Sequence, residues 1–234
     1  MTAIRSQPLA TTTPSKPVPP LENGDRLSRA EFERRYLASP HIKKAELIEG
    51  VVYMPSPVRI NRHAGPHLLL SGWLFQYLRK TPGLKLFGDN GTVRLDEDNE
   101  PQPDLFLAVG RAAGGKAALS EDDYLEGAPD LVCEIAASSV SIDLHAKLNV
   151  YRRNGVREYL VWRTEDRAVD WFVLNEGRYE VLQQEGGFLR SKVFPGLWLD
   201  VSALIDGNLD ALVAPVDSGT QTPEHAAFMT HLQQ

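Results

Sequence analysis

Two acidic residues and a lysine lie among apolar side chains in the stretch from Pro101 to Trp162. Asp104 precedes the run Leu-Phe-Leu-Ala-Val, Glu134 lies inside Leu-Val-Cys-Glu-Ile-Ala, and Lys147 lies in a segment with leucines at helical spacing. A charged side chain is costly to bury unless it is paired or holds a metal. Carboxylate oxygens suit Mg²⁺ or Mn²⁺, which accept substrate phosphate. The three residues therefore predict a small metal site with a cationic helper that stabilises charge on phosphorus.

The strand predicted over 131–136 sets the direction of Glu134. Alternation along a strand places Glu134 and Ala136 on one face and Cys133 on the other. Asp104 stands at the start of a second predicted strand, directly after a proline. If the two strands are neighbours, their carboxylates can converge at one point.

The helix that follows is expected to begin near Ser141, as its N-cap, and to end at Asn154-Gly155. Its apolar stripe consists of Leu144, Leu148 and Tyr151, and Lys147 falls at the edge of that stripe. This position directs the lysine toward the sheet rather than toward solvent.

A purely structural explanation fits the same spacing. Asp143 and Lys147 are four residues apart and could form an ion pair on the helix surface, while Glu134 binds an arginine. Ion-pair networks of this kind imitate active sites. Spacing alone does not separate the two explanations.

The chain as a whole reads as one α/β (α+β) domain at residues 24–205. Residues 1–23 are rich in Pro, Thr and Ser and are expected to be a disordered leader, and residues 206–234 a flexible tail. Further helices and strands are expected from the apolar spacing and turn residues. The predicted helices are 29–38, capped by Ser28 with Glu31, 61–80, with Pro66 in its first turn, and a short turn at 202–204; the predicted strands are 46–48, 51–54, 84–87, 92–95, 169–174, 179–182 and 188–193.

Composition narrows the class of protein. The chain has 234 residues, of which 42% are hydrophobic and 24% charged, so it can form a core without disulfides. The single cysteine excludes an internal disulfide framework and fits a reducing cytoplasm. No apolar run approaches the ~18 residues of a membrane span, and no signal-peptide core begins the chain. The net charge of −6 argues against a protein that coats nucleic acid nonspecifically, but not against a nucleic-acid substrate.

An ordered set of short motifs resembles the PD-(D/E)XK nuclease superfamily, in particular its Uma-type family of restriction endonucleases. The resemblance covers roughly residues 27–204. The pieces are Glu46-Leu47-Ile48-Glu49-Gly50, Ser56-Pro57 followed by His63, Pro103-Asp104, Pro129-Asp130-Leu131-Val132-Cys133-Glu134-Ile135, Asp143-Leu144-His145-Ala146-Lys147-Leu148 and Gly155-Val156-Arg157-Glu158-Tyr159-Leu160-Val161.

The resemblance implies a restriction-endonuclease-like fold, a central mixed β-sheet flanked by helices. It implies Asp104 and Glu134 as ligands of Mg²⁺ (or Mn²⁺) and Lys147 as the catalytic lysine. The superfamily pattern has a lysine two residues after the glutamate, where this chain has Ala136; in the Uma-type group the following helix supplies it. The expected function is a metal-dependent endonuclease, a hydrolase of phosphodiester bonds, most plausibly in DNA. The alternative is a catalytically silent nuclease-fold binding or interaction module.

Several other residues were weighed for the site. Glu46 and His63 are auxiliary candidates, one as an extra carboxylate and the other near metal or phosphate. His63 and His67 have a spacing that zinc enzymes use, but no glutamate follows His63, so zinc is discounted. Asp130 is expected to begin a strand. Duplex cleavage requires two strand scissions, which makes a homodimer a natural assembly.

Overall fold

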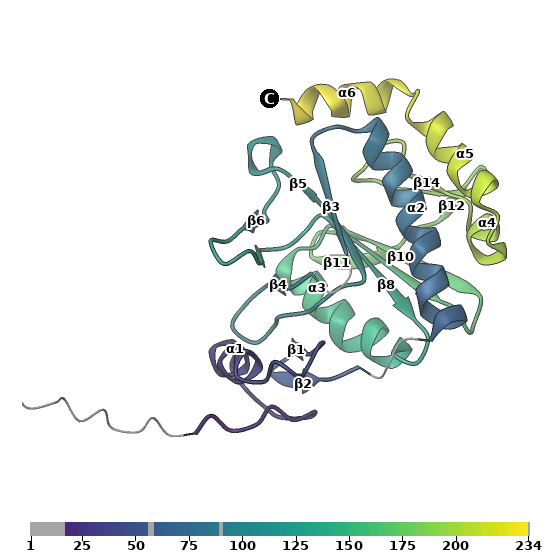
Figure 1. Ribbon diagram of the computed structural model, residues 1–234. Coiled ribbons are helices and arrows are strands. Elements are labelled where there is room, and N and C mark those ends of the chain that lie inside the picture. Colours follow the sequence, from purple (N-terminus) through teal and green to yellow (C-terminus); the bar gives the residue numbers. More distant parts are fainter. Residues whose placement is uncertain (1–16, 56–58, 89–90, 234) are drawn as a thin grey trace, which may run out of the picture.

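A six-stranded mixed sheet runs through the centre of the protein (Figure 1). The computed structural model describes residues 17–55, 59–88 and 91–233. The sheet order is β11-β10-β9-β8-β5-β3, in which β8 and β9 are parallel and all other neighbours antiparallel. Its strands are β3 (Leu84–Gly88), β5 (Leu105–Val109), β8 (Leu131–Ala136), β9 (Glu158–Arg163), β10 (Ala168–Asn175) and β11 (Arg178–Val181). This sheet, flanked by helices, confirms the predicted restriction-endonuclease-like fold.

Side chains alternate between the two faces of this sheet and build two cores. On one face, strands β5, β8, β9 and β10 pack against helix α2 (Gly65–Lys80), which contributes Trp73 and Tyr77. On the other face, β8 and β9 pack against α3 (Leu148–Asn154), with Tyr151 at the centre. Cys133 belongs to the first core and Ala136 to the second, as alternation predicts. Glu134 therefore faces α3.

The connection from β8 to β9 is a helical crossover, which parallel neighbouring strands require. It begins as a π-helical turn, η3 (Ile142–Lys147), and continues as α3. Gly155 ends α3 with a φ of 80°, a left-handed conformation that favours glycine. Ser141 precedes the helix but makes no side-chain cap; the hydroxyl of Ser139 binds Asp143 instead. The predicted cap is wrong, while the predicted end is confirmed.

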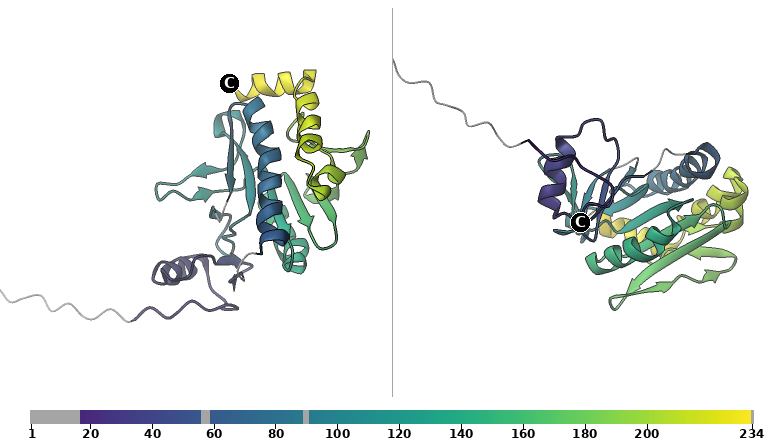
Figure 2. Two further views of the ribbon diagram at one scale, coloured as in Figure 1. Left: turned by 45° about the vertical axis from the view of Figure 1, so that its right-hand side comes forward. Right: turned by 90° about the horizontal axis from the view of Figure 1, so that it is seen from below.

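The N-terminal elements form a lobe at one end of the sheet, seen at the bottom in Figure 1 and in the left view of Figure 2. The lobe comprises α1 (Arg29–Leu37), β1 (Glu46–Ile48) and β2 (Val51–Tyr53) around the buried Phe32. Leu21 is also buried there, inside the segment expected to be disordered. Residues 1–16 lie outside the described residues. Ser28 makes no side-chain cap, and Glu31 binds Arg34 and Arg35 instead of completing a capping box, so the predicted capping box is wrong.

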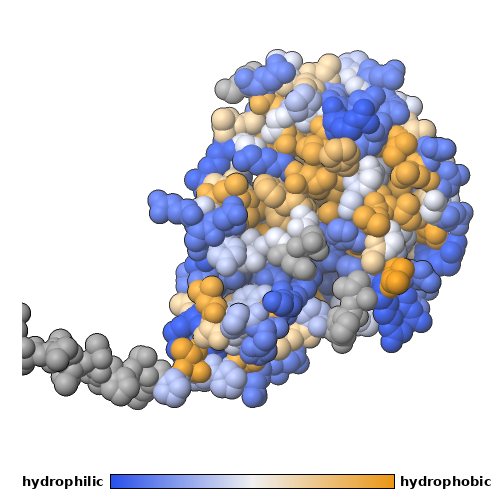
Figure 3. Space-filling model, viewed as in Figure 1, coloured by the Kyte–Doolittle hydropathy of each residue, from blue (hydrophilic) through white to orange (hydrophobic). Residues whose placement is uncertain are grey.

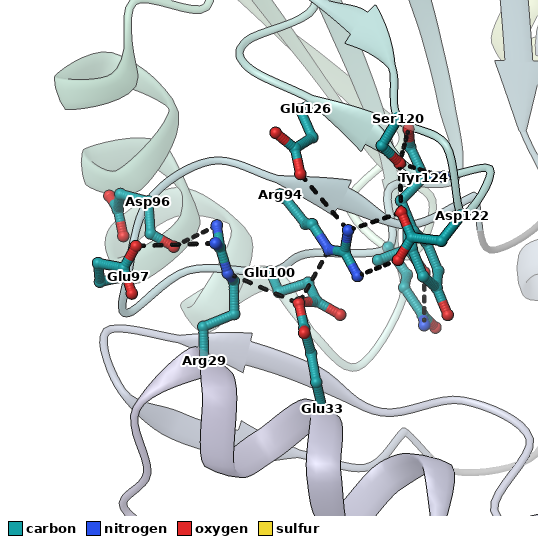
Figure 4. Close-up of polar contacts among 12 residues, drawn as sticks. Arg29, Glu33, Arg94, Asp96, Glu97, Glu100, Ser120, Asp122, Tyr124 and Glu126 are labelled. Carbon is teal, nitrogen blue, oxygen red and sulfur yellow. Dashed lines mark hydrogen bonds and ion pairs between the residues drawn. The ribbon is translucent and has the colours of Figure 1, made fainter.

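Arg94 joins this lobe to the rest of the molecule (Figure 4). Its guanidinium lies 2.8 Å from Glu33 of α1, 2.8 Å from Asp122 and 3.4 Å from Glu126, and it stacks over the Tyr124 ring at 4.3 Å. The contacts extend across a small sheet of β4 (Val93–Arg94), β6 (Ala118–Leu119) and β7 (Leu125–Glu126). The arginine thus ties three separate segments together.

The C-terminal region is folded, contrary to the flexible tail expected from its small and polar composition. Residues 206–234 contain α5 (Leu209–Gly219) and α6 (Pro223–Leu232), which follow α4 (Val201–Asp206). Leu212 and Val216 of α5 are fully buried in the core against α2. His225 of α6 binds the Thr81 hydroxyl at 3.0 Å. The prediction is wrong because the small and polar residues of this segment alternate with apolar ones that share a helix face, of which Leu212 and Val216 meet α2.

The remaining elements are short. They are the π-helical turn η1 (Ile60–Ala64), the 3-10 turn η2 (Arg111–Ala113), and a three-stranded sheet of β12 (Gln184–Glu185), β13 (Phe188–Arg190) and β14 (Trp198–Leu199). In the part of the chain that the structure describes, no helix combines the length and apolarity needed to cross a membrane.

Candidate active site

Glu134 projects from the middle of β8 into a buried polar cluster. Its Oε1 accepts hydrogen bonds from the Lys147 ammonium at 3.0 Å and from the Tyr151 hydroxyl at 2.9 Å. Lys147 and Tyr151 are four residues apart on the crossover helix, so both project from the same helix face. Strand and helix therefore meet at this carboxylate.

The Lys147 ammonium contacts two further carboxylates. Glu46 of β1 lies 2.9 Å away and Asp143 lies 3.8 Å away. Both carboxylates have other partners: Glu46 accepts from the backbone N–H of Gln102, and Asp143 from Ser139. Lys147 is only 5% exposed and Asp143 2%. The alternative of an exposed helical pair is therefore wrong, as is an arginine partner for Glu134.

Asp104 directly precedes β5, the strand that pairs with β8, and β8 carries Glu134. Its Oδ2 accepts from the backbone N–H of Ile135 at 2.7 Å, which places it beside the residue that follows Glu134. Its Oδ1 lies 3.1 Å from Nε2 of His63 and 4.0 Å from Nζ of Lys44. The convergence of the two strands on one point is thus present.

Gly88 allows the neighbouring strand β3 to approach Asp104. A Cβ atom at this position would lie 2.9 Å from the Asp104 carbonyl oxygen and 2.7 Å from the Leu105 side chain. Real Cβ contacts of that length do not occur without a shift of the neighbour, and a backbone oxygen cannot easily move. The absence of a side chain at Gly88 therefore allows β3 to lie close to Asp104.

Two π-helical turns present the residues that bind these carboxylates. His63 lies on η1 and Lys147 on η3. A π-turn inserts one extra residue into a helix and rotates the following side chains, and such turns concentrate at functional sites. The turn η1 directs His63 toward Asp104, and the turn η3 directs Lys147 toward Glu134.

Burial dominates the electrostatics of the cluster. It raises the pKa of Glu134 to about 8, against the opposing charge of Lys147. Burial also raises the pKa of Asp143, while the pKa of Asp104 is lowered, because the hydrogen bond and charge of His63 outweigh desolvation. Burial disfavours the charged form of Lys147, but the surrounding carboxylates keep its pKa well above the usual range. Lys147 is a cation at neutral pH.

The cluster suits a divalent cation by charge and donor type. Three carboxyl groups, those of Glu46, Glu134 and Asp143, contact the ammonium of Lys147, and the Asp104 carboxylate lies beside Ile135, the residue after Glu134. Their oxygens are the hard donors that Mg²⁺ and Mn²⁺ prefer. Among the described residues, however, no three His, Cys, Asp or Glu side chains already stand at metal-binding distances. The donor type fits such an ion, and Asp104 and Glu134 are the two residues that would hold it.

The structure also places the other residues weighed from the sequence. The Asp130 carboxylate accepts a hydrogen bond from the Val109 N–H at 2.8 Å and pairs with Arg157 at 3.2 Å. These contacts are in keeping with a residue that begins a strand. Nε2 of His67 donates to the Asp104 carbonyl oxygen, 3.0 Å away, rather than forming a zinc pair with His63. Ser56-Pro57 lies outside the described residues.

Two members of the cluster were missed. Tyr151 was assigned only to the apolar stripe of its helix, and Asp143 only to a surface pair. Both are four residues from Lys147, so they share its face. A sequence reading that placed Lys147 toward the sheet could have placed both residues beside it.

The comparisons with known proteins agree with this geometry. The family model Uma2, described as "Putative restriction endonuclease", matches residues 29–202, which is most of the chain. The chain belongs to the Uma2 family. A solved structure titled as a putative nuclease from Anabaena variabilis ATCC 29413 matches with a TM-score of 0.55 and 14% identity, covering 74% of this chain and 96% of that one. At this identity the likeness shows the fold alone. No curated protein matches the sequence.

The match to the Uma2 model contains every residue of the polar cluster, from Glu46 to Tyr151. It extends through α1 and the N-terminal lobe and ends in α4, before α5 and α6. The helices α5 and α6 lie outside the matched residues; α5 packs along α2, and α6 covers the C-terminal end of α2, where His225 binds Thr81 (Figure 2).

Proposed function

We propose that this Uma2 protein is a metal-dependent endonuclease that hydrolyses phosphodiester bonds in DNA. The observation that carries the proposal is the convergence of Asp104, Glu134 and Lys147 from three elements on one buried, negatively charged point. A purely structural ion pair needs one carboxylate per ammonium, whereas Lys147 faces three. Family membership supports a nuclease, and the oxygen-rich cluster supports Mg²⁺ or Mn²⁺ as its metal.

Asp104 and Glu134 would hold the metal, which when bound supplies an activated water and neutralises charge on the phosphate. The Ile135 N–H holds Oδ2 of Asp104, and the Tyr151 hydroxyl holds Oε1 of Glu134, so both carboxylates are oriented before the metal enters. Lys147 places a fixed positive charge beside Glu134, where it would stabilise negative charge developing on the phosphate oxygens.

The auxiliary residues position this set. Glu46 holds the Lys147 ammonium from the lobe side and is itself fixed by the Gln102 N–H, 2.7 Å away. His63 would hold Oδ1 of Asp104 in place. Because Glu46 belongs to β1, the N-terminal lobe is part of the site and not an appendage.

The test is nicking of supercoiled plasmid DNA by the purified full-length chain. Cleavage is expected with Mg²⁺ or Mn²⁺ and is expected to stop when EDTA is in excess, with recovery on adding metal back. Undiminished cleavage in excess chelator contradicts the metal mechanism. The oligomeric state measured in the same buffer tests whether a homodimer makes the two scissions of duplex cleavage.

A second candidate function is a catalytically silent nuclease-fold module that binds nucleic acid or another partner. The observation in its favour is that the Lys147 ammonium is fully engaged by carboxylates within the protein. On this reading the chain binds Mn²⁺ and DNA, yet plasmid DNA stays supercoiled under all metal conditions.

A further inference from the structure

An apolar groove opens beside the candidate active site, between helix α2 and the edge strand β3. Its volume is about 480 Å³. His67, Ser71 and Phe75 form the α2 wall, and Leu86 and Leu105 form the sheet side. Figure 3 shows apolar side chains gathered over these two elements on this face of the molecule. The volume falls within the range of roughly 300–1,000 Å³ that is typical of ligand sites.

The groove is continuous with the candidate site. His67, at one end of it, binds the carbonyl oxygen of Asp104, and Leu105 is the next residue in the chain. The α2 wall uses positions 67, 71 and 75, which lie in a row along the helix because they are four residues apart. At 1.5 Å per residue the row is about 12 Å long. The groove lies on the α2 side of the sheet and Glu134 on the α3 side, so the end of the groove at His67, against the Asp104 backbone, is the part that reaches the site.

The lining of the groove suits the flat apolar face of a nucleobase. Phe75 is 56% exposed, an unusual state for a phenylalanine on a helix that buries Leu74 and Trp73 next to it. The Ser71 hydroxyl donates to the His67 carbonyl at 2.6 Å, which leaves its oxygen lone pairs as acceptors. Base–aromatic stacking of this kind tolerates every base, because every base has a π-face.

Resting on the proposed nuclease function, we infer that this groove holds an unpaired nucleobase next to the scissile phosphate, with Phe75 as its stacking platform. A paired base cannot reach the groove wall, because its faces are stacked within the duplex. The substrate class is therefore DNA with an extrahelical or single-stranded base at the cleavage point. A second copy of the chain is the competing occupant, since β3 is an edge strand of the sheet.

The test compares two duplex oligonucleotides of one sequence, one fully paired and one with a single bulged 2-aminopurine, in Ca²⁺ in place of Mg²⁺. Wild-type protein is expected to bind the bulged duplex more tightly and to change the 2-aminopurine fluorescence. Phe75→Ala is expected to weaken binding of the bulged duplex by roughly 5- to 150-fold and to spare the paired one. Val181→Ala is the matched control, because Val181 is 53% exposed on the opposite edge strand, β11. Thermal unfolding confirms that both variants fold.

The possible outcomes distinguish failure of the base-binding inference from failure of the proposed nuclease function. If wild type cleaves paired DNA with metal but shows no preference for the bulged duplex, the inference fails and the proposed function stands. If Phe75→Ala keeps the full preference, the groove is not the base site. If Phe75→Ala turns a dimer into a monomer without changing the preference, a second copy covers the groove. If wild type neither binds nor cleaves any DNA, both proposals fall.

Discussion

Lys147 and Glu134 form a buried ion pair between a helix and a strand, with 3.0 Å between Nζ and Oε1. The two residues are 13 positions apart, and the crossover between β8 and β9 must begin with the η3 turn for the ammonium to reach the carboxylate. Breaking a buried ion pair by removing one partner is strongly destabilising, since the other charge is left alone. The pair therefore affects both the stability of the fold and the proposed chemistry.

Tyr151→Phe should lower the free energy of unfolding by about 1.5–3 kcal/mol. The hydroxyl donates to Oε1 of Glu134, and hydrogen bonds to charged groups are the stronger kind. Urea denaturation of the full chain at pH 9, above the raised pKa of Glu134, measures the change. Tyr179→Phe is the matched control, because its hydroxyl binds the neutral carbonyl of Val156 at 2.9 Å and should cost only about 0.5–1.5 kcal/mol. Equal costs for the two variants contradict a charged Glu134–Tyr151 bond.

Leu212→Ala should destabilise the protein by roughly 2–5 kcal/mol, because Leu212 is fully buried between α5 and α2. Leu209→Ala, three residues earlier and 49% exposed, should change stability by no more than about 0.5 kcal/mol. Removal of residues 208–234 should cost more than either. If that truncation melts at the full-length temperature, α5 does not stabilise the domain.

Stability should fall as pH rises from about 4.5 to about 8. Burial and the hydrogen bond of Glu33 raise the pKa of Glu100 to about 8, with Arg94 and Arg29 opposing the shift. The folded chain therefore keeps a proton that the unfolded chain loses near pH 4.5, so the stabilisation is complete below that pH and is lost as pH passes 8. One such group gives a slope of at most about 1.4 kcal/mol per pH unit.

Glu100→Gln tests whether Glu100 causes this pH dependence of stability, because glutamine stays neutral throughout and can still donate to Glu33. Its melting temperature should decline less between pH 5 and pH 8 than that of wild type. The pKa of Glu134, also raised to about 8, contributes in the same direction and leaves a residual slope in the variant. Identical pH profiles for the two proteins contradict a protonated Glu100.

Local patterns in the sequence were sufficient to predict the main strands of the sheet and the face from which Glu134 projects. Alternation over β8 assigned Glu134 and Cys133 to opposite faces, and the Asn154-Gly155 signal gave the end of the crossover helix. Local patterns did not show that β5 and β8 are neighbours, which is the pairing that brings Asp104 beside Ile135. The resemblance to a known family supplied that condition.

Contacts between distant segments escaped prediction because no local pattern encodes them. Glu46 reaches Lys147 only because the N-terminal lobe closes over the end of the sheet. The helices α5 and α6 are short, so their stability comes from packing on the core and not from helix propensity alone. The two serine caps failed for the opposite reason: a local signal was present, but Glu31 binds Arg34 and Arg35, and Ser139 rather than Ser141 binds in the first turn of the crossover helix.

The central claim is that Lys147 acts on the substrate phosphate, and the plasmid-nicking rate of Lys147→Ala tests it most directly. The variant should lose about 10²–10³ in rate. It should also lose roughly 3–5 kcal/mol of stability, so the rate is measured well below its melting temperature. Lys80→Ala, which breaks the exposed pair with Asp217, is the control and should cleave like wild type.

The double variant Ala136→Lys with Lys147→Ala returns a lysine to the same face of β8 as Glu134, two residues further along the strand. Its nicking rate, set against that of Lys147→Ala, is the decisive measurement. Partial recovery of metal-dependent nicking places both lysines at one site, as the account predicts. Nicking at the wild-type rate by folded Lys147→Ala alone contradicts it and removes Lys147 from the chemistry.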